Sequence, residues 1–354
     1  MISTRKLAEL AGVSQSTISR CLNDSPDISF ETKERIRTLA REHGYIIKKK
    51  HTKTICSSSR KVIGVLIMRH GFFEDLFLNQ VLCELYSIIE NENYYAMPLL
   101  DFYGVNGTER LHDLLSLGIF EGLIIINRKY DEVIDQYLSS IGLPHVYLIY
   151  HLRKTAKQSH IIDTDNFAGG YLATKHLIDL GHRKIATITS PLDEYSDRTE
   201  GYKAALNEAN ITYDSELVFL AGVNYQSYYD IIRLKTDVFQ DATALFSQFD
   251  IGAFGAISAL TDTGYHVPED VSVIGFDGLD IDTMFRPTLT TIKQPYRDLA
   301  MQTVERLLQL ANTPNFRADG KVYLRPELVL RESTLPFEKT SPRIKRDWYS
   351  NGKP

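Results

Sequence analysis

Cysteine is scarce in this chain of 354 residues, which contains only Cys21, Cys56 and Cys83. The number is odd and the spacing matches no metal-binding pattern, so we expect reduced thiols of a cytoplasmic protein and no disulfide framework. No run of 18 or more apolar residues is present, so a membrane-spanning helix is not expected. The polar N-terminus lacks the apolar core of a signal peptide, and export is therefore not expected.

The chain also lacks the short motifs of several enzyme classes. It contains no GxSxG nucleophile elbow, no phosphate-binding loop of the Walker type and no CxxC pair. His176 and His182 are six residues apart, a spacing that a helix separates, so no metal site is expected. Asp163 and Asp165 would point to the same side of a strand, but no nucleophile or metal cluster accompanies them. We therefore expect neither enzyme activity nor a cofactor.

Charge is abundant but unevenly distributed along the chain, whose net charge is −5. Residues 1–61 contain 13 Lys and Arg against 6 Asp and Glu, a net charge of +7, and the remainder carries −12. The alternative explanations are a chance fluctuation and a solvated basic segment. A basic head on an acidic body favours a nucleic-acid-binding module joined to a domain with another task.

Three short amphipathic helices are predicted between Ser3 and Tyr45. The first is expected to turn an apolar stripe inward, and a turn containing Gly12 joins it to the second. The third helix is expected to begin after Ser29 and to end at Gly44. The side chains expected to be buried in the first helix are Leu7, Leu10 and Ala11.

The second helix has the features of a DNA-recognition helix. Ser14 is a good N-cap for it. Gln15, Ser16, Ser19 and Arg20 share one face, and the opposite face is formed by Ile18, Cys21 and Leu22. Arginine, glutamine and serine side chains all pair with base edges in the major groove. The alternative is a three-helix packing unit with a solvated polar face.

The run LAELAGVSQSTISRCLND, followed by TKERI and GY, resembles the N-terminal DNA-binding domain of the LacI/GalR family of bacterial regulators. The resemblance implies that Gln15 and Ser16 occupy two specificity positions and that Arg20 contacts bases. It also implies that phosphates are contacted by Ser14, Thr17, Ser19 and Asn23.

Residues 47–61 are expected to form a linker, because they are rich in Lys, Ser and Thr. The segment departs from the family, whose members usually carry a Pro-Asn-x-x-Ala-Arg-x-Leu pattern that forms a hinge helix and wedges a leucine into the minor groove. Ile47 replaces the proline, and Lys48 replaces the asparagine. Whether a hinge helix forms is left open, but phosphates are expected to be contacted by Lys48, Lys49 and Lys50.

From Val62 onward, apolar strand patterns alternate with amphipathic helices in two successive series. This order predicts an α/β fold with two lobes, each a doubly wound parallel sheet, and a ligand cleft at the carboxyl ends of the strands. We expect a helix-turn-helix headpiece at 1–46, a linker at 47–61, an effector-binding domain at 62–333 and a polar tail at 334–354. Within the effector domain, we expect lobe 1 to comprise 62–161 and 291–320, and lobe 2 to comprise 162–290 and 321–333.

Several segments of the second half, including VPEDVSVIGFDGLD, PTLTTIKQP and RPELVLRES, resemble the effector-binding domain of the same family. The implied fold is that of periplasmic sugar-binding proteins. The resemblance implies that Arg198 binds ligand hydroxyls or carboxylates and that Asp277 accepts hydrogen bonds from sugar hydroxyls. Phe249 stands where the family often has a sugar-binding asparagine. The other expected effector contacts are Phe72, Phe73, Asp163 and Tyr225, although the two phenylalanines have an equal alternative as core residues.

Together these features predict a sequence-specific transcriptional repressor of sugar-utilisation genes, controlled by a small-molecule effector between the two lobes. The expected partners are a near-palindromic operator, a sugar and a second copy of the chain in a homodimer. The tail lacks the heptads of a tetramerising coiled coil. The alternatives are the same class of regulator with a purine or a phosphoprotein as effector, a sugar-binding receptor, and a sugar-acting enzyme.

Overall fold

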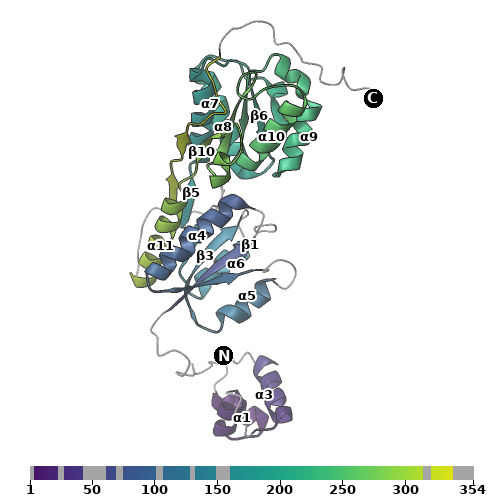
Figure 1. The fold of residues 1–354 in the computed structure, drawn as a ribbon. Helices are drawn as coiled ribbons and strands as arrows, with labels where there is room; N and C mark the ends of the chain where they lie inside the picture. Colours follow the sequence, from purple (N-terminus) through teal and green to yellow (C-terminus); the bar gives the residue numbers. More distant parts are fainter. Residues whose placement is uncertain are drawn as a thin grey trace. The chain divides into compact units, whose positions relative to one another are not determined.

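The computed structural model describes residues 4–22, 28–42, 61–68, 75–100, 107–127, 132–148, 160–313 and 320–337. The chain divides into two units, one formed by residues 1–60 with the stretch 112–118 and the other by the remainder (Figure 1). Within the described ranges, every helix is too short or too polar to cross a lipid bilayer.

The headpiece contains the three predicted helices, α1 (Thr4–Ala11), α2 (Gln15–Leu22) and α3 (Phe30–Glu42). Gly12 adopts the left-handed conformation in the turn before α2, with φ of +65°. Ser29 accepts a hydrogen bond from the Thr32 amide at 3.3 Å and so caps α3. The shared core consists of Leu7, Ala8, Ala11, Ile18, Cys21, Ile36 and Ala40.

One prediction for the headpiece is wrong, because Leu10 is 43% exposed. It follows Leu7 by three residues, but the narrow core of the three helices is already filled by Leu7 and Ala11 on α1. The predicted helix end at Gly44 lies outside the described residues.

The first sheet has the strand order β11-β5-β4-β3-β1-β2, and all of its paired strands are parallel. Its apolar strands are buried on both faces, as is usual for parallel sheets covered by helices. The strands are β1 (Val62–Met68), β2 (Tyr95–Leu99), β3 (Phe120–Asn127), β4 (His145–Leu148), β5 (Ile161–Thr164) and β11 (Lys321–Leu324).

Helices α4 (Leu76–Asn91) and α11 (Tyr296–Asn312) lie side by side on the first sheet (Figure 1). They bury alternate strand residues such as Ile63 and Val65. Asp75 caps α4 by accepting a hydrogen bond from the Leu78 amide at 2.9 Å. The other helices in this part of the chain are α5 (Gly107–Leu115) and α6 (Glu132–Ser140).

The second sheet has the order β12-β10-β9-β8-β6-β7, with β12 antiparallel to β10 and the other pairs parallel. The predicted pair of doubly wound lobes in an α/β fold is therefore confirmed. The strands are β6 (Ile185–Thr189), β7 (Val218–Leu220), β8 (Ala244–Ser247), β9 (Ser272–Asp277), β10 (Thr290–Lys293) and β12 (Glu327–Val329).

Separate hydrophobic clusters cover the two faces of the second sheet. Helices α7 (Asn166–Asp179) and α8 (Asp193–Glu208) form one cluster with the sheet, and α9 (Tyr225–Leu234) and α10 (Asp250–Asp262) form the other. Three short 3-10 helices complete this part of the chain: η2 (Ser215–Leu217), η3 (Thr236–Gln240) and η4 (Asp280–Thr283).

The chain crosses between the sheets later than expected. Strand β5 pairs in the first sheet, β10 in the second, and β11 again in the first, so the crossings follow Thr164, Lys293 and Leu324. The expected boundaries at 161/162, 290/291 and 320/321 fall a few residues too early. The reason is strand pairing, because each of these strands completes its ladder before the chain leaves the sheet.

The start of the expected polar tail is packed against the second sheet. The Phe337 amide donates to the Leu180 carbonyl at 2.7 Å, and the Leu335 amide donates to Ser272 Oγ at 3.0 Å. Residues 338–354 lie outside the described ranges.

Candidate DNA-binding face and effector site

The recognition helix α2 begins with a hydroxyl cluster. Ser14 Oγ accepts a hydrogen bond from the Thr17 amide at 3.1 Å, which places Ser14 at the predicted N-cap. The same oxygen lies 2.7 Å from Ser16 Oγ and 2.8 Å from Thr17 Oγ1. The first turn of α2 is therefore held by its own side chains.

The polar and apolar faces of α2 lie as predicted. Ile18 and Cys21 are fully buried. Arg35 on α3 donates to the Ala11 carbonyl at 3.3 Å, which fixes the end of α1 beside the turn. Thr17 is half-buried, and the exposed side chains are Ser14, Gln15, Ser16, Ser19 and Arg20. The expected phosphate contacts Asn23, Lys48, Lys49 and Lys50 lie outside the described residues.

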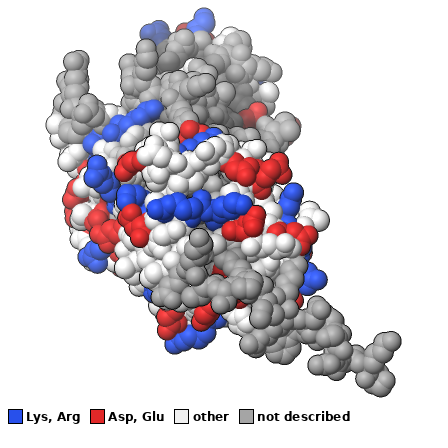
Figure 2. All heavy atoms as spheres, turned by 90° about the horizontal axis from the view of Figure 1, so that it is seen from above, with Lys and Arg blue, Asp and Glu red and all other residues white. Residues whose placement is uncertain are grey.

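The sequence after residue 61 is acidic, in contrast to the basic headpiece sequence. On the face in Figure 2, the described Lys and Arg side chains are interspersed with Asp and Glu. Pairs such as Lys184 with Asp241, at 2.8 Å, and Lys203 with Glu200, at 3.0 Å, neutralise one another. On this face the described residues therefore form no continuous basic stripe of the kind that tracks a phosphate backbone.

Arg198 is the buried cation of the second lobe, with an exposed fraction of 5%. Its Nε donates to Asn166 Oδ1 at 2.8 Å, and its Nη1 donates to the Gln248 carbonyl at 2.5 Å. The guanidinium carbon lies 3.7 Å from the centre of the Phe276 ring, a cation–π contact. These contacts hold the planar fork at the carboxyl end of β8.

Two glycines bring the backbone of α8 close enough for Arg198 to reach α7. A Cβ added at Gly170 would overlap the Arg198 carbonyl, and one added at Gly201 would overlap the Phe167 carbonyl. The close approach of the two helices sets Arg198 against Asn166, the first residue of α7.

The buried side-chain amide of Gln248 supports the same region, at the carboxyl end of β8. Its Nε2 donates to Thr187 Oγ1 at 3.2 Å and to Thr199 Oγ1 at 3.0 Å, and its Oε1 accepts from Thr189 Oγ1 at 3.1 Å. This satisfies both donors of a side chain that is fully buried. The backbone carbonyl that receives Arg198 therefore belongs to a rigidly held residue.

Asp277 ends β9 and is 4% exposed. Gln294 Nε2 donates to its Oδ1 at 2.7 Å, and Thr164 Oγ1 donates to Gln294 Oε1 at 2.7 Å. This chain of hydrogen bonds joins the end of β5 in the first sheet to the end of β9 in the second. Burial raises the pKa of Asp277, and the positive charge of Arg198 opposes that shift.

The structure therefore brings Arg198 and Asp277 together at the carboxyl ends of the second sheet, where open α/β sheets bind ligands. A guanidinium fork supplies several hydrogen-bond donors and a carboxylate supplies acceptors. The pair matches the alternating donor and acceptor character of a polyhydroxylated ligand.

The remaining expected effector contacts are less closely grouped. Asp163 is buried in β5 and accepts a hydrogen bond from the Thr164 amide at 2.7 Å. Phe249 is half-buried beside α10 and packs edge-on against Tyr228, with ring centres 5.9 Å apart. Tyr225 opens α9, is 40% exposed and stacks on Tyr229 at 6.4 Å. Phe72 and Phe73 lie outside the described residues.

Asp165 has a structural role, because it caps α7 by accepting a hydrogen bond from the Ala168 amide at 2.9 Å. The sequence reading missed the residues that support Arg198 and Asp277. In the sequence, only their position marks these residues. Each lies at or just after the end of a strand, next to a segment that resembles the family. These residues are Thr164, Asn166, Gln248, Asp250, Gln294 and Tyr296.

Comparisons with known proteins agree with the fold of the headpiece and of the two-sheet body. Residues 5–47 match the model of bacterial regulatory proteins of the lacI family, and residues 174–334 match the model of a periplasmic binding protein-like domain. The HTH-type transcriptional regulator MalR of Clostridium butyricum is 31% identical, over 94% of this chain and 99% of its own length. Among solved structures, the transcriptional regulator CelR–cellobiose complex is 27% identical, with a TM-score of 0.69 over 94% of this chain and 100% of that one. The lac repressor dimer bound to operator and the anti-inducer ONPF is 26% identical, with a TM-score of 0.66 over 94% of this chain and 99% of that one.

Proposed function

Because the chain belongs to the LacI family of bacterial regulatory proteins, we propose that its two-sheet body binds a sugar and thereby controls the grip of the headpiece on an operator. The protein is a DNA-binding regulator of transcription. The observation that carries the sugar proposal is the placement of Arg198, over the ring of Phe276, next to Asp277 at the end of β9, where both side chains are buried.

The chemistry of this pair favours a polyhydroxylated effector. Each sugar hydroxyl donates one hydrogen bond and accepts others, so it can pair with the Asp277 carboxylate and the Arg198 fork together. A related protein supports the same class, since the CelR structure contains cellobiose. The proposed sites are Asp163, Arg198, Tyr225, Phe249 and Asp277, with Phe72 and Phe73 on the segment after β1.

We further propose a cytoplasmic homodimer that represses genes of sugar use and has no catalytic activity. A two-fold protein pairs naturally with a near-palindromic operator, since each headpiece reads one half-site. The lac repressor, to which this chain is similar, was solved as a dimer on its operator. A sugar that favours the lobe arrangement with weak operator affinity would relieve repression, through a coupling of about 1–3 kcal/mol.

Selection of bound sequences from random duplex DNA tests the proposal directly. We expect the purified protein to enrich a near-palindromic site and a subset of unphosphorylated mono- and disaccharides to release it. Purine bases and phosphorylated sugars serve as the comparison set in the same assay. Release by a purine alone would overturn the sugar proposal, and absence of any enriched site would contradict operator recognition by the headpiece.

The substitution Arg20→Ala is expected to weaken binding to the selected operator by about 1–3 kcal/mol and to relax the base preference at one position. The reason is that Arg20 is exposed on the recognition face of α2, where a guanidinium can pair with two guanine acceptors. Arg20→Lys is the matched control because it keeps the charge and loses the fork. Equal loss on every DNA sequence would show that Arg20 contacts only phosphate.

The operator is expected to be less sharply kinked than a leucine wedge would make it. The linker at 47–61 lacks the hinge-helix pattern, because Ile47 replaces the proline and Lys48 replaces the asparagine. Circular-permutation assays on the selected operator measure the bend. A strong central kink in that assay would show that another residue of the linker acts as the wedge.

A further inference from the structure

Helix α9 carries a tyrosine whose hydroxyl is buried in the second lobe. Tyr228 is fully buried, and its hydroxyl has no hydrogen-bond partner among the described residues. Buried polar groups are nearly always paired, because an unpaired one loses its bonds to water without replacement. Tyrosine hydroxyls in particular find a partner when they are buried. The hydroxyl of Tyr228 is therefore a candidate donor to a molecule that the protein binds.

Tyr228 lies near the edge of the second sheet that carries the effector site. Helix α9 follows β7, and β7 runs parallel to β6. The helix therefore begins at the carboxyl ends of the strands, the edge at which β8 and β9 also end. Asn224 caps it there by accepting a hydrogen bond from the Ser227 amide at 2.8 Å. Tyr228 follows this cap by four residues, so it lies in the first turns of the helix.

The ring of Tyr228 is fixed against α10. A Cβ added at Gly252 would lie 2.4 Å from Tyr228 Cδ1, so a larger residue there would displace the ring. The backbone of α10 is also close to that of α9 at Gly255, where a Cβ would lie 2.3 Å from the Tyr225 carbonyl oxygen. Phe249 packs edge-on against the ring of Tyr228, with ring centres 5.9 Å apart. Close packing of this kind keeps the hydroxyl in one place.

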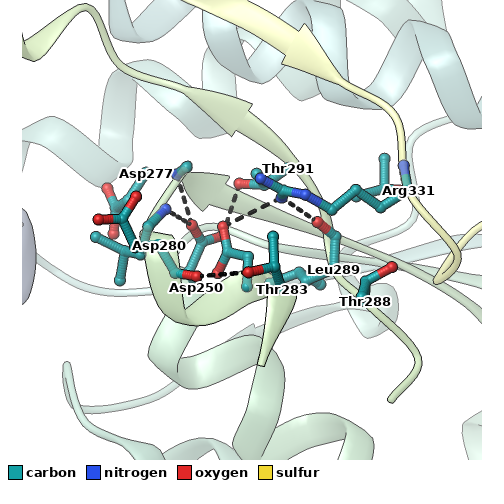
Figure 3. Close-up of polar contacts among 12 residues, drawn as sticks. Asp250, Asp277, Asp280, Thr283, Thr288, Leu289, Thr291 and Arg331 are labelled. Atoms are coloured by element: carbon teal, nitrogen blue, oxygen red, sulfur yellow. Dashed lines mark hydrogen bonds and ion pairs between the residues drawn. The ribbon is translucent and has the colours of Figure 1, made fainter. Parts of the chain in front are cut away.

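The start of α10 also supports the turn that carries Asp277. Asp250, the first residue of α10, is fully buried, and its Oδ2 accepts a hydrogen bond from the Gly278 amide at 2.6 Å. Its Oδ1 accepts from Thr291 Oγ1 at 2.7 Å (Figure 3). The turn needs such support because Asp277 and Gly278 have φ of +135° and +78°, in the region that favours glycine. Asp250 therefore ties α10 to the acceptor side of the effector site.

The residues before and after Phe249 join its contact with Tyr228 to the effector site. The Gln248 carbonyl accepts a hydrogen bond from Arg198 Nη1 at 2.5 Å. Asp250 holds the turn after β9. Phe249 lies between Gln248 and Asp250 in the chain and contacts the ring of Tyr228. Tyr228 is therefore packed on the short segment that positions both the guanidinium fork and that turn.

The neighbouring groups of the effector site act on the Tyr228 hydroxyl. Burial and the nearby Tyr195 raise the pKa of Tyr228 well above its ordinary value. The positive charge of Arg198 opposes this rise, and the negative charge of Asp277 adds to it. Tyr195 belongs to the same site, because its ring centre lies 4.8 Å from the Arg198 guanidinium carbon. The phenol of Tyr228 therefore keeps its proton at neutral pH and is a hydrogen-bond donor.

We propose that Tyr228 is an effector-binding residue whose hydroxyl donates a hydrogen bond to an oxygen of the bound sugar. The proposal rests on the sugar-binding function of Arg198 and Asp277. These two side chains supply charged donors and a charged acceptor, and Tyr228 adds an uncharged donor beside the apolar ring of Phe249. A sugar hydroxyl, ring oxygen or glycosidic oxygen has the lone pair that such a donor requires.

The hydroxyl gives the site a means of selecting among sugars. A site built to hydrogen-bond a ligand atom rejects an analogue that lacks this atom, because the group of the protein is then left unpaired. Arg198, Asp277 and Tyr228 are all shielded from solvent, so water is a poor replacement for a missing sugar oxygen there. A sugar that presents carbon in place of oxygen to Tyr228 is therefore bound more weakly.

Thermal unfolding of the effector-free protein tests whether the hydroxyl is unpaired. Tyr228→Phe removes only the hydroxyl and keeps the ring that packs on Gly252, so we expect a Tm equal to or higher than that of wild type. Tyr229→Phe is the matched control, because the Tyr229 hydroxyl donates to Asp262 Oδ2 at 2.6 Å and accepts from Arg233 Nη1 at 3.2 Å. Its loss should lower the Tm slightly. A Tm of Tyr228→Phe below that of wild type would show an internal partner of the hydroxyl and overturn the proposal.

Titration of operator release with a panel of unphosphorylated sugars that includes glucose and cellobiose tests the contact itself. In the full-length protein, we expect Tyr228→Phe to raise the half-maximal concentration of the active sugar by roughly 5- to 100-fold, because a sugar oxygen loses its donor. Tyr229→Phe should respond as the wild type does.

The wild-type titration separates this proposal from the one on which it rests. If a sugar releases the operator from wild type and from Tyr228→Phe at the same concentration, the role of Tyr228 is overturned and the sugar proposal stands. If no sugar of the panel releases the operator from wild type, the sugar proposal is overturned, and the partner assigned to Tyr228 is overturned with it.

Discussion

Asp282→Asn is expected to be more stable relative to wild type in mildly alkaline buffer than in mildly acidic buffer. The side chains are close in size, and the asparagine amide is uncharged at every pH. Relative to wild type, we expect a gain of up to about 4 kcal/mol at about pH 8.5 compared with about pH 5.5.

The sign follows from the two pKa values of Asp282. In the unfolded chain an aspartate has a pKa of about 3.9. In the folded protein, burial raises the pKa of Asp282 to about 10. The stabilising contribution of the protonated group is therefore complete below about pH 4 and is lost as pH rises through the folded pKa, by up to about 1.4 kcal/mol per pH unit. Because asparagine does not titrate, the stability of the variant lacks this dependence on pH.

Thermal unfolding at a series of pH values measures the effect. A gain of this size corresponds to a rise in Tm on the order of 10 °C in a domain of this class. Asp280→Asn removes the same charge from an exposed neighbour and should shift the Tm by little at any pH. Parallel Tm curves for wild type and Asp282→Asn would contradict a proton held on Asp282.

The elements of this fold follow closely from local patterns in the sequence. The alternation of apolar strands and amphipathic helices predicts both sheets, whose strands are parallel except for β12. The small polar residues after Ser14 predict the exposed face of α2. The exposure of Leu10 shows the limit of such patterns. Helical spacing predicts which side of a helix faces the core, but it does not predict the width of that core. The points at which the chain crosses between the sheets differ from the predicted ones for a related reason. The pairing of strands in a ladder depends on residues that are distant in sequence.

The residues that support Arg198 and Asp277 could not be predicted from the spacing of residues in the sequence. Gln294 binds Asp277 from the next strand and meets Thr164, which is 130 positions away in the chain. The buried pair of Asp250 and Asp282 is likewise created by a turn, and an aspartate in sequence carries no mark of burial. Arg198 and Asp277 were identified because they occupy family motifs, while the groups that orient them required the tertiary structure.

Asp277→Asn is expected to reduce the response to the effector by roughly 10- to 100-fold in half-maximal concentration while operator affinity without effector stays unchanged. Asparagine keeps one oxygen that can accept from Gln294 Nε2 and replaces the other acceptor by a donor. A hydrogen bond from a sugar hydroxyl to a charged group contributes about 1.5–3 kcal/mol, which corresponds to that loss. Asparagine also tolerates the positive φ of this position better than alanine does, so the variant avoids added backbone strain.

Titration of operator release with the sugar found in the selection assay measures the change. Asp280→Asn, three residues further along the chain, removes an exposed carboxylate and should give the wild-type response. An Asp277→Asn protein that releases the operator at the wild-type sugar concentration would remove Asp277 from the effector site. A loss of operator affinity in the absence of sugar would instead show that the Asp277 turn supports the DNA-binding arrangement of the lobes. These measurements separate recognition of the sugar from coupling to the headpiece. Recognition depends on a contact between Asp277 and the bound sugar, whereas operator affinity without sugar does not.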